Sequence, residues 1–407
     1  MGEAGEADRR IGRKGERRRT QELPPILRHG FRPFFLLGPV FAAFAVLCWL
    51  ALLADLAVLP GAADPLAWHQ HEMLFGFASA VVAGFILTAI PNWTGRLPVN
   101  GLPLAALAGL WIAGRIAMFA GTLLGSATTA LIEGTFLIVL AALVGREIVS
   151  GGNWRNLVPA TLIAWLAIGN AAFHLEHGYG LALDGIGTRL AIAALAMLIG
   201  MIGGRIVPSF TRNWLVKRQA AALPSPFGIV DKLALITLAI ALLGWVFLPE
   251  SRSVGFFLAV AGVAQMIRLA RWQGWRCVAE PLVLILHVGY GWLGLGLLLL
   301  GLANLASPFS DLAALHALTT GAFGTMMLAV MTRATLGHTG RALTADGWTL
   351  LIYAAVTLGA LARTISPLIP DETWLEVAGL LWAGAFLLFA LTYGPMLLRA
   401  NPKRAGA

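Results

Sequence analysis

The chain has 407 residues, of which 58% are hydrophobic and 12% charged, and its mean hydropathy is +0.79. An average soluble domain has about twice this charged fraction, so the composition excludes an ordinary water-soluble protein. The formal net charge of +9 does not indicate nucleic-acid binding, because the basic residues cluster in a tail and in alternate loops.

Twelve apolar stretches follow one another along the chain, and each is long enough to cross the ~30 Å hydrocarbon layer as a helix. Backbone groups in lipid must bond internally, and the sequence lacks the short alternating strands of a membrane barrel. We therefore predict an all-α polytopic membrane protein. The predicted spans are 33–56, 67–92, 101–122, 125–146, 156–177, 184–208, 229–248, 253–270, 280–303, 311–332, 347–366 and 373–397.

Basic and acidic residues occupy different loops. Lys and Arg gather in the N-terminal tail, in every second loop and at the C-terminus, whereas the other loops carry mostly Asp and Glu. This positive-inside distribution predicts a multi-pass protein of the bacterial inner membrane with both termini in the cytoplasm. We expect residues 1–30 to form a basic tail that is disordered or lies on anionic lipid, 31–398 to form one twelve-helix membrane domain, and 399–407 to form a second basic tail.

The predicted helices fall into a repeat. Five positions of the second span recur 245 residues later in the tenth: His71 as His316, Gly76 as Gly321, and Thr94-Gly95-Arg96 as Thr339-Gly340-Arg341. The sixth span shares Pro208 and Thr211 with Pro91 and Thr94 of the second. We infer three pseudo-repeats of four helices, with spans 2, 6 and 10 as equivalents.

Two histidines occupy the same position in this repeat. They are His71 and His316, whereas the second unit has Thr188 there. Imidazole is the usual axial ligand of haem iron, so the pair could bind opposite faces of one haem. The simpler alternative is that each histidine only bonds a neighbouring helix.

Further histidines near the outer ends of the spans are candidate metal ligands. His174 and His177 are separated by three residues, so they share a helix face and could hold one metal ion such as copper. His69 and His71 diverge by about 200° on a helix and cannot easily share one ion unless His69 lies in the loop. His287 lies about two turns into span 9 and is a weaker candidate.

Two charged residues lie at similar depth in neighbouring spans. An unpaired charge inside the membrane is costly, so we predict a structural ion pair between Arg115 and Glu133. The functional alternative is that Arg115 holds a haem propionate. Glu72, which follows His71, could hold a ring N–H, relay protons or face interfacial water.

Several blocks of sequence resemble the NnrS family of bacterial membrane proteins, and the resemblance extends from the first span to the loop after the tenth. The blocks are Phe31-Arg32-Pro33-Phe34-Phe35, Trp68-His69-Gln70-His71-Glu72-Met73, the segments from Gly84 to Gly95, from Gly204 to Thr211 and from His316 to Ala322, and the segment from Met331 to Gly340. The resemblance implies bound haem and copper and a role in the response to nitric oxide.

A looser, architectural resemblance is to the catalytic subunit of haem–copper oxidases. That subunit also has twelve helices in three pseudo-repeats, with histidine ligands in helices 2 and 10, where His71 and His316 lie here. Its paired copper histidines in helix 7 have no counterpart, because span 7 contains no histidine. The second resemblance therefore does not extend to a binuclear centre.

These observations favour a haem- and copper-containing membrane protein that binds or detoxifies nitric oxide, or relieves metal–nitrosyl damage. The alternatives are a transporter of a small molecule or metal complex, and a sensor that signals through a partner. If nitric oxide is turned over, a quinol or an electron-donor protein must supply electrons, because the sequence contains no flavin or iron–sulfur motif. Membrane lipid is the other expected partner.

Overall fold

The computed structural model describes residues 20–58, 64–305, 310–369 and 371–401, and these residues form helices and loops without a strand. Most of the predicted basic tail, together with residues 402–407, lies outside the described residues. Twelve helices are long and apolar enough to cross a membrane, so the prediction of a twelve-span helical protein is confirmed.

The spans agree closely with the predicted apolar stretches. They are α2 (Phe31–Leu53), α3 to α4 (Pro65–Thr94), α5 (Gly101–Phe119), α7 (Ser126–Ser150), α8 (Leu157–Tyr179), α9 to α10 (Ile186–Lys217), α11 (Ile229–Phe247), α12 (Arg252–Ala270), α13 (Pro281–Leu305), α14 to α15 (Asp311–His338), α16 to η7 (Gly347–Leu368) and α17 (Thr373–Leu398). Short helical turns lie between them: η1 (Pro25–Leu27), α6 (Gly121–Leu124), η3 (Trp154–Asn156) and η5 (Gly274–Cys277).

Two spans are longer than predicted. The sixth ends at Lys217 rather than at residue 208, and the tenth ends at His338 rather than at residue 332. Both helices continue with polar residues beyond the apolar stretch. A helix is held by its backbone hydrogen bonds, which do not require apolar side chains. Pro208 lies inside α10 (Gly204–Lys217) and does not end that helix.

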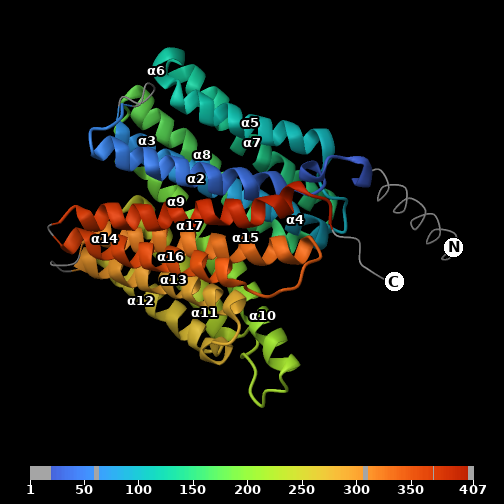
Figure 1. The fold of residues 1–407 in the computed structure, drawn as a ribbon. Helices are drawn as coiled ribbons and strands as arrows, with labels where there is room; N and C mark the ends of the chain where they lie inside the picture. Colours follow the sequence, from blue (N-terminus) through green and yellow to red (C-terminus); the bar gives the residue numbers. More distant parts are fainter. Residues whose placement is uncertain (1–19, 59–63, 306–309, 370, 402–407) are drawn as a thin grey trace.

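Helices that follow one another in the chain pack side by side, and the last helix, α17, returns to the first, α2 (Figure 1). Spans 2, 6 and 10 contact one another in the middle of this arrangement. In each of them 72% of the apolar window is buried inside the protein, whereas the other spans range from 33% to 67%. These three spans are therefore the central helices of the bundle.

The three central spans share one irregularity. Each contains a π-helical segment, η2 (Glu72–Ala78) in span 2, η4 (Ile199–Gly203) in span 6 and η6 (Ala317–Gly324) in span 10. A π-helical turn is wider than an α-helical turn and is frequent at functional sites. A predicted repeat would account for this shared feature, and the repeat itself stays a prediction.

Side chains from other spans bind a carbonyl oxygen in each π-helical segment. Trp111 Nε1 donates to Gly76 O at 2.9 Å, Arg268 Nη1 donates to Gly200 O at 2.7 Å, and Trp382 Nε1 donates to Thr320 O at 3.3 Å. Carbonyls released from regular helix bonding must find donors inside the membrane. The π-helical segments are thus fixed by neighbouring spans.

Both described ends of the chain lie at one end of the bundle, opposite α3 (Pro65–His71) and α14 (Asp311–His316) (Figure 1). Arg32, at the start of α2, is 1% exposed and caps the end of α17. Its guanidinium donates to Leu397 O at 2.6 Å, to Arg399 O at 2.8 Å and to Asn401 Oδ1 at 2.6 Å. The first and last spans are therefore joined at the end where the described chain begins and ends.

Candidate metal centre

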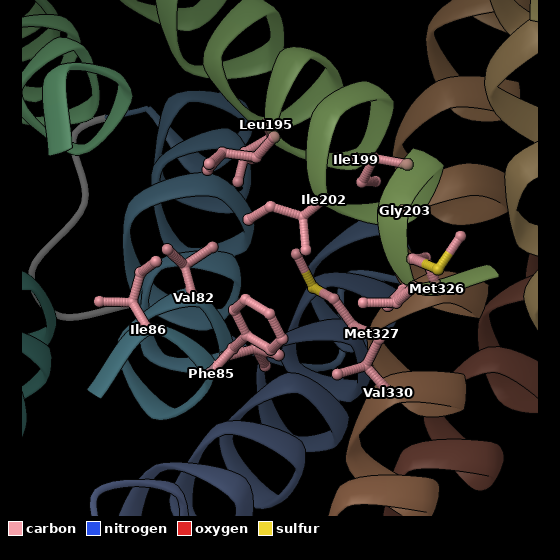
Figure 2. Close-up of a pocket in the computed structure, with 13 residues that line it drawn as sticks. Val82, Phe85, Ile86, Leu195, Ile199, Ile202, Gly203, Met326, Met327 and Val330 are labelled. Carbon is pink, nitrogen blue, oxygen red and sulfur yellow. The ribbon is translucent and has the colours of Figure 1, made fainter. Parts of the chain in front are cut away.

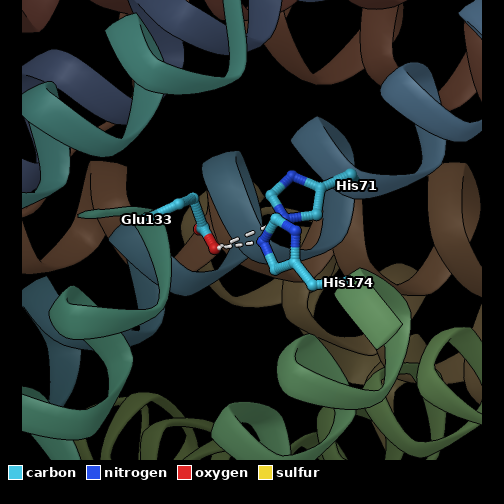
Figure 3. Close-up of side chains that lie close together, drawn as sticks. All are labelled: His71, Glu133 and His174. Carbon is cyan, nitrogen blue, oxygen red and sulfur yellow. Dashed lines mark hydrogen bonds and ion pairs between the residues drawn. The ribbon is translucent and has the colours of Figure 1, made fainter. Parts of the chain in front are cut away.

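Polar side chains from four spans meet at the end of α3. His71 is the last residue of α3, and Glu133 projects from the middle of α7. Asn170 and His174 are one turn apart on α8, so they share a face of that helix. One ligand atom from each of His71, Glu133 and His174 lies within 4.8 Å of the others (Figure 3).

This cluster is shielded from solvent. His71, Glu133 and Asn170 are fully buried, Glu72 is 1% exposed, and His174 is half-buried. Burying so many ionisable groups in a membrane span is costly unless they bind one another or a ligand. The hydrogen bonds within the cluster therefore decide what it can hold.

Both ring nitrogens of His71 face oxygen atoms. Nδ1 donates to Glu72 Oε1 at 2.8 Å, which agrees with the first of the three alternatives for Glu72, that it holds a ring N–H. Nε2 lies 3.0 Å from Asn170 Oδ1 and 3.5 Å from Glu133 Oε2. Histidines that ligate a metal through one nitrogen usually donate the other N–H to a carboxylate, as His71 does.

Glu133 is the hub of the cluster. Its Oε2 accepts from Asn170 Nδ2 at 2.5 Å and from His174 Nε2 at 3.1 Å, and its Oε1 accepts from Arg115 Nη2 at 2.5 Å. Arg115 Nη1 donates to Glu72 Oε1 at 2.6 Å, so one guanidinium bridges two carboxylates. The predicted ion pair between Arg115 and Glu133 is confirmed.

The charges of the cluster require one more cation. Glu72 and Glu133 carry two negative charges and Arg115 carries one positive charge, all in buried positions. A second proton on His71, for which both ring nitrogens have acceptors, makes the cluster neutral. A monovalent metal cation such as Cu⁺ in the place of that proton would do the same, since isolated charge is strongly disfavoured in a buried site.

The donor atoms fit a metal ion. Two imidazole nitrogens and one carboxylate oxygen suit copper, zinc or iron. Asn170 Oδ1 is a possible fourth ligand. Asn170 and Glu133 occupy the Nε2 side of the His71 ring, and this arrangement favours a single ion over a haem at this histidine. The cluster is thus a candidate site for a single ion.

Glu72 gives a direct test of how His71 is oriented. We expect Glu72→Gln to lower metal affinity by about 10–100-fold, the usual effect of removing the carboxylate that orients a ligating histidine. Metal titration of the purified variant beside the wild type measures this. An unchanged affinity would contradict an orienting role for Glu72.

The other predicted ligands lie outside this cluster. His177 stacks on Phe173 at 4.1 Å, and its Nδ1 donates to Phe173 O at 3.1 Å. His69 stacks on Trp49 at 4.7 Å, and its buried Nδ1 has no hydrogen-bond partner among the described residues. The structure therefore brings His71 together with His174, and neither His69 nor His177 joins them.

The two remaining histidines bond elsewhere. His316 Nδ1 donates to Leu312 O at 2.7 Å, and His287 Nε2 lies 2.8 Å from Thr211 Oγ1. Among the described residues, no hydrogen bond or ring contact joins His316 to His71. A haem held by this pair stays a prediction.

Two members of the cluster were not predicted as ligands. Glu133 was assigned only to an ion pair, and Asn170 was overlooked. The available signal was the four-residue spacing between Asn170 and His174, which places both on one helix face. The approach of Glu133 could not be read from one sequence, because it depends on how α7 packs against α8.

A comparison with protein families matches residues 25–401 of the chain to the model described as NnrS protein. The matched region includes all twelve spans and every residue of the cluster. A comparison with curated protein sequences finds no match.

Proposed function

Since this chain belongs to the NnrS family, we propose that it is a membrane protein of the nitric oxide response that binds a copper ion at His71, Glu133 and His174. The observation that carries the assignment of the site is the convergence of three ligand atoms within 4.8 Å in a buried cluster that lacks one positive charge. Copper is the ion that the family resemblance implies, and imidazole nitrogen suits it.

The surrounding residues have separate tasks in this proposal. Glu72 holds the Nδ1 proton of His71 and so directs the Nε2 lone pair towards Glu133 and His174. Arg115 binds both Glu72 and Glu133 and balances one of their two negative charges. Trp111 donates to Gly76 O and so fixes the π-helical segment that follows His71. Asn170 holds Glu133 Oε2 and supplies an amide oxygen as a further donor.

The bound ion would supply a site at which nitric oxide can coordinate. Nitric oxide is small, neutral and apolar, so it can reach a site inside the membrane through lipid, where charged molecules cannot follow. His174 is half-buried and is the most exposed member of the three-residue ligand set, so we propose that a ligand approaches past this side chain. We therefore propose binding of nitric oxide at this site, and electron supply by a quinol or a donor protein stays a prediction.

We also propose an orientation in the bacterial inner membrane. The positive-inside distribution of charges predicts that both ends of the chain are cytoplasmic, so the cluster at the end of α3 would lie in the outer half of the membrane. A haem at His316, transport of a metal complex and signalling through a partner stay predictions. Transport in vesicles that survives replacement of His71 and His174 would favour the second of these.

Metal analysis of purified protein tests the site. We expect bound copper in the wild type and its loss in His174→Ala, because the two ligands that remain, His71 and Glu133, hold the ion only weakly. The matched control is His177→Ala, one turn further along the same exposed end of α8, where the side chain contacts Phe173 rather than the cluster.

Two outcomes would contradict the proposal. One is a wild-type protein that remains free of metal after copper is supplied. The other is equal copper content in His174→Ala and His177→Ala, which would place the ion elsewhere in the chain.

A further inference from the structure

We propose that the cavity between the three central spans is a binding site for a small, neutral, apolar molecule of the size of a diatomic gas. The identification of that gas as nitric oxide rests on the proposed function. The existence of the site does not, because it follows from the cavity alone.

The cavity lies where spans 2, 6 and 10 meet (Figure 2). Val82, Phe85 and Ile86 line it from α4, Ile199 and Ile202 from η4, and Met326, Met327 and Val330 from α15 (Thr325–His338), with five further residues from the same spans. Several of these side chains point from three helices into one common space. In the part of the chain that the structure describes, all the lining residues belong to these three spans.

The position of η4 accounts for an opening at this level. In the register of the predicted repeat, η2 and η6 begin at equivalent residues, Glu72 and Ala317. The segment η4 begins at Ile199, which corresponds to Val82, ten residues further along. In this register the wider turn of span 6 is opposite regular α-helix in the other two spans. Val82, Ile199 and Met327 occupy equivalent positions of the three spans, and all three line the cavity.

The lining determines the chemical class of the ligand. All thirteen lining residues are apolar, and none offers a charged group or a hydroxyl. A water molecule inside would lose the roughly three hydrogen bonds that buried waters usually make, so the cavity should be dry. Apolar cavities of this kind take up xenon or small apolar molecules.

The volume limits the size of the ligand. The cavity measures about 80 Å³, and one water-sized body needs about 10–15 Å³ on the same measure. A diatomic gas or a xenon atom fits with room to move. Met326 and Met327 border the space, and their flexible thioethers can adapt to an occupant.

The cavity and the metal cluster lie along the same central helix. His71 and Val82 are eleven residues apart in span 2, or about 16 Å at 1.5 Å per residue. A gas held here would be stored within the protein near the copper site rather than bound to it. The two sites share no residue, so they can be altered separately.

Xenon is the probe for this site. We expect crystals of the full chain under xenon pressure to give one anomalous peak between Ile202 and Met327. Ile202→Phe, which adds a ring to the cavity, should abolish the peak, and Met327→Ala, which enlarges the space, should strengthen it. The matched control is Ile240→Phe, an equal change at a residue of α11 that is 51% exposed on the outside of the bundle.

The outcomes separate this proposal from the copper site. Absence of a xenon peak in the wild type, ordered water in the cavity, or acyl-chain density there would each overturn the gas site. A peak that persists at full strength in Ile202→Phe would do the same. Copper content measured on the same preparations tests the metal centre independently, since either site can fail while the other is present.

Discussion

Arg115→Met should be the most damaging single substitution in the membrane domain. Arg115 is the cation shared by Glu72 and Glu133, at 2.6 Å and 2.5 Å, and all three side chains are buried. Without it, protonation of His71 balances only one of two carboxylates. Removing one partner of a buried ion pair typically costs about 3–5 kcal/mol, so we expect little folded protein in detergent.

A charge-restoring variant makes this expectation specific. Arg115→Met combined with Glu72→Gln removes one positive and one negative charge, so the cluster is neutral again when His71 is protonated. We expect the double variant to recover much of the wild-type yield and thermal stability, as measured by size-exclusion chromatography and a melting curve. If the double variant is as unstable as Arg115→Met, packing of the long side chain rather than charge explains the loss.

Glu133→Gln should separate metal binding from folding. The amide keeps the shape of the carboxylate, and its oxygen still accepts from Arg115. Its NH2 then faces Asn170 and His174, which can accept from it if the Asn170 amide flips or the His174 ring changes tautomer. The remaining charges of Glu72 and Arg115 balance without a proton or an ion. A glutamine nitrogen has no lone pair for a metal, so the site loses its anionic ligand. We expect a stable protein that binds no copper.

The measurement is the melting temperature with and without added copper. A ligand at 100 times its dissociation constant stabilises the folded state by about 2.7 kcal/mol, so the wild type should melt higher with copper and Glu133→Gln should not respond. Glu133→Ala is the contrasting variant, because it leaves Arg115, Asn170 and His174 without their acceptor and should melt lower even without metal. Copper stabilisation of Glu133→Gln equal to that of the wild type would remove Glu133 from the ligand set.

Hydropathy predicted the spans well, because apolar length is the property that a membrane selects. The start of α11 at Ile229 and the start of α5 at Gly101 agree with the predicted spans. The ends of the sixth and tenth spans were predicted too early, since Lys217 and His338 lie on polar turns that continue the helix outside the apolar stretch.

The π-helical segments could not be predicted from composition. Their residues, such as Gly76 and Gly200, are ordinary in membrane helices, and the wide turns persist because Trp111 and Arg268 from other spans bind the released carbonyls. Those partners are distant in sequence. The irregularity is therefore a property of tertiary packing rather than of local propensity.

The candidate site was predicted in part. The depth of His71 and His174 in the spans pointed to a functional role, because ionisable groups within membrane helices are rare. The residues that contact His71 could not be predicted from the sequence, because Asn170 and Glu133 approach it only through the packing of α7 and α8 against α3. A repeat that relates His71 to His316 gave no information about these contacts.

The cap that Arg32 forms on α17 has a consequence for synthesis of the chain. This arginine enters the membrane with the first span, yet its acceptors, Leu397 O, Arg399 O and Asn401 Oδ1, belong to or directly follow the twelfth span and leave the ribosome after the other eleven. Until then a buried position carries an uncapped guanidinium, and the end of the bundle stays open. A nascent chain that stops before α17 therefore lacks the acceptors of Arg32, so the end of the first span is completed only when the last span packs against it.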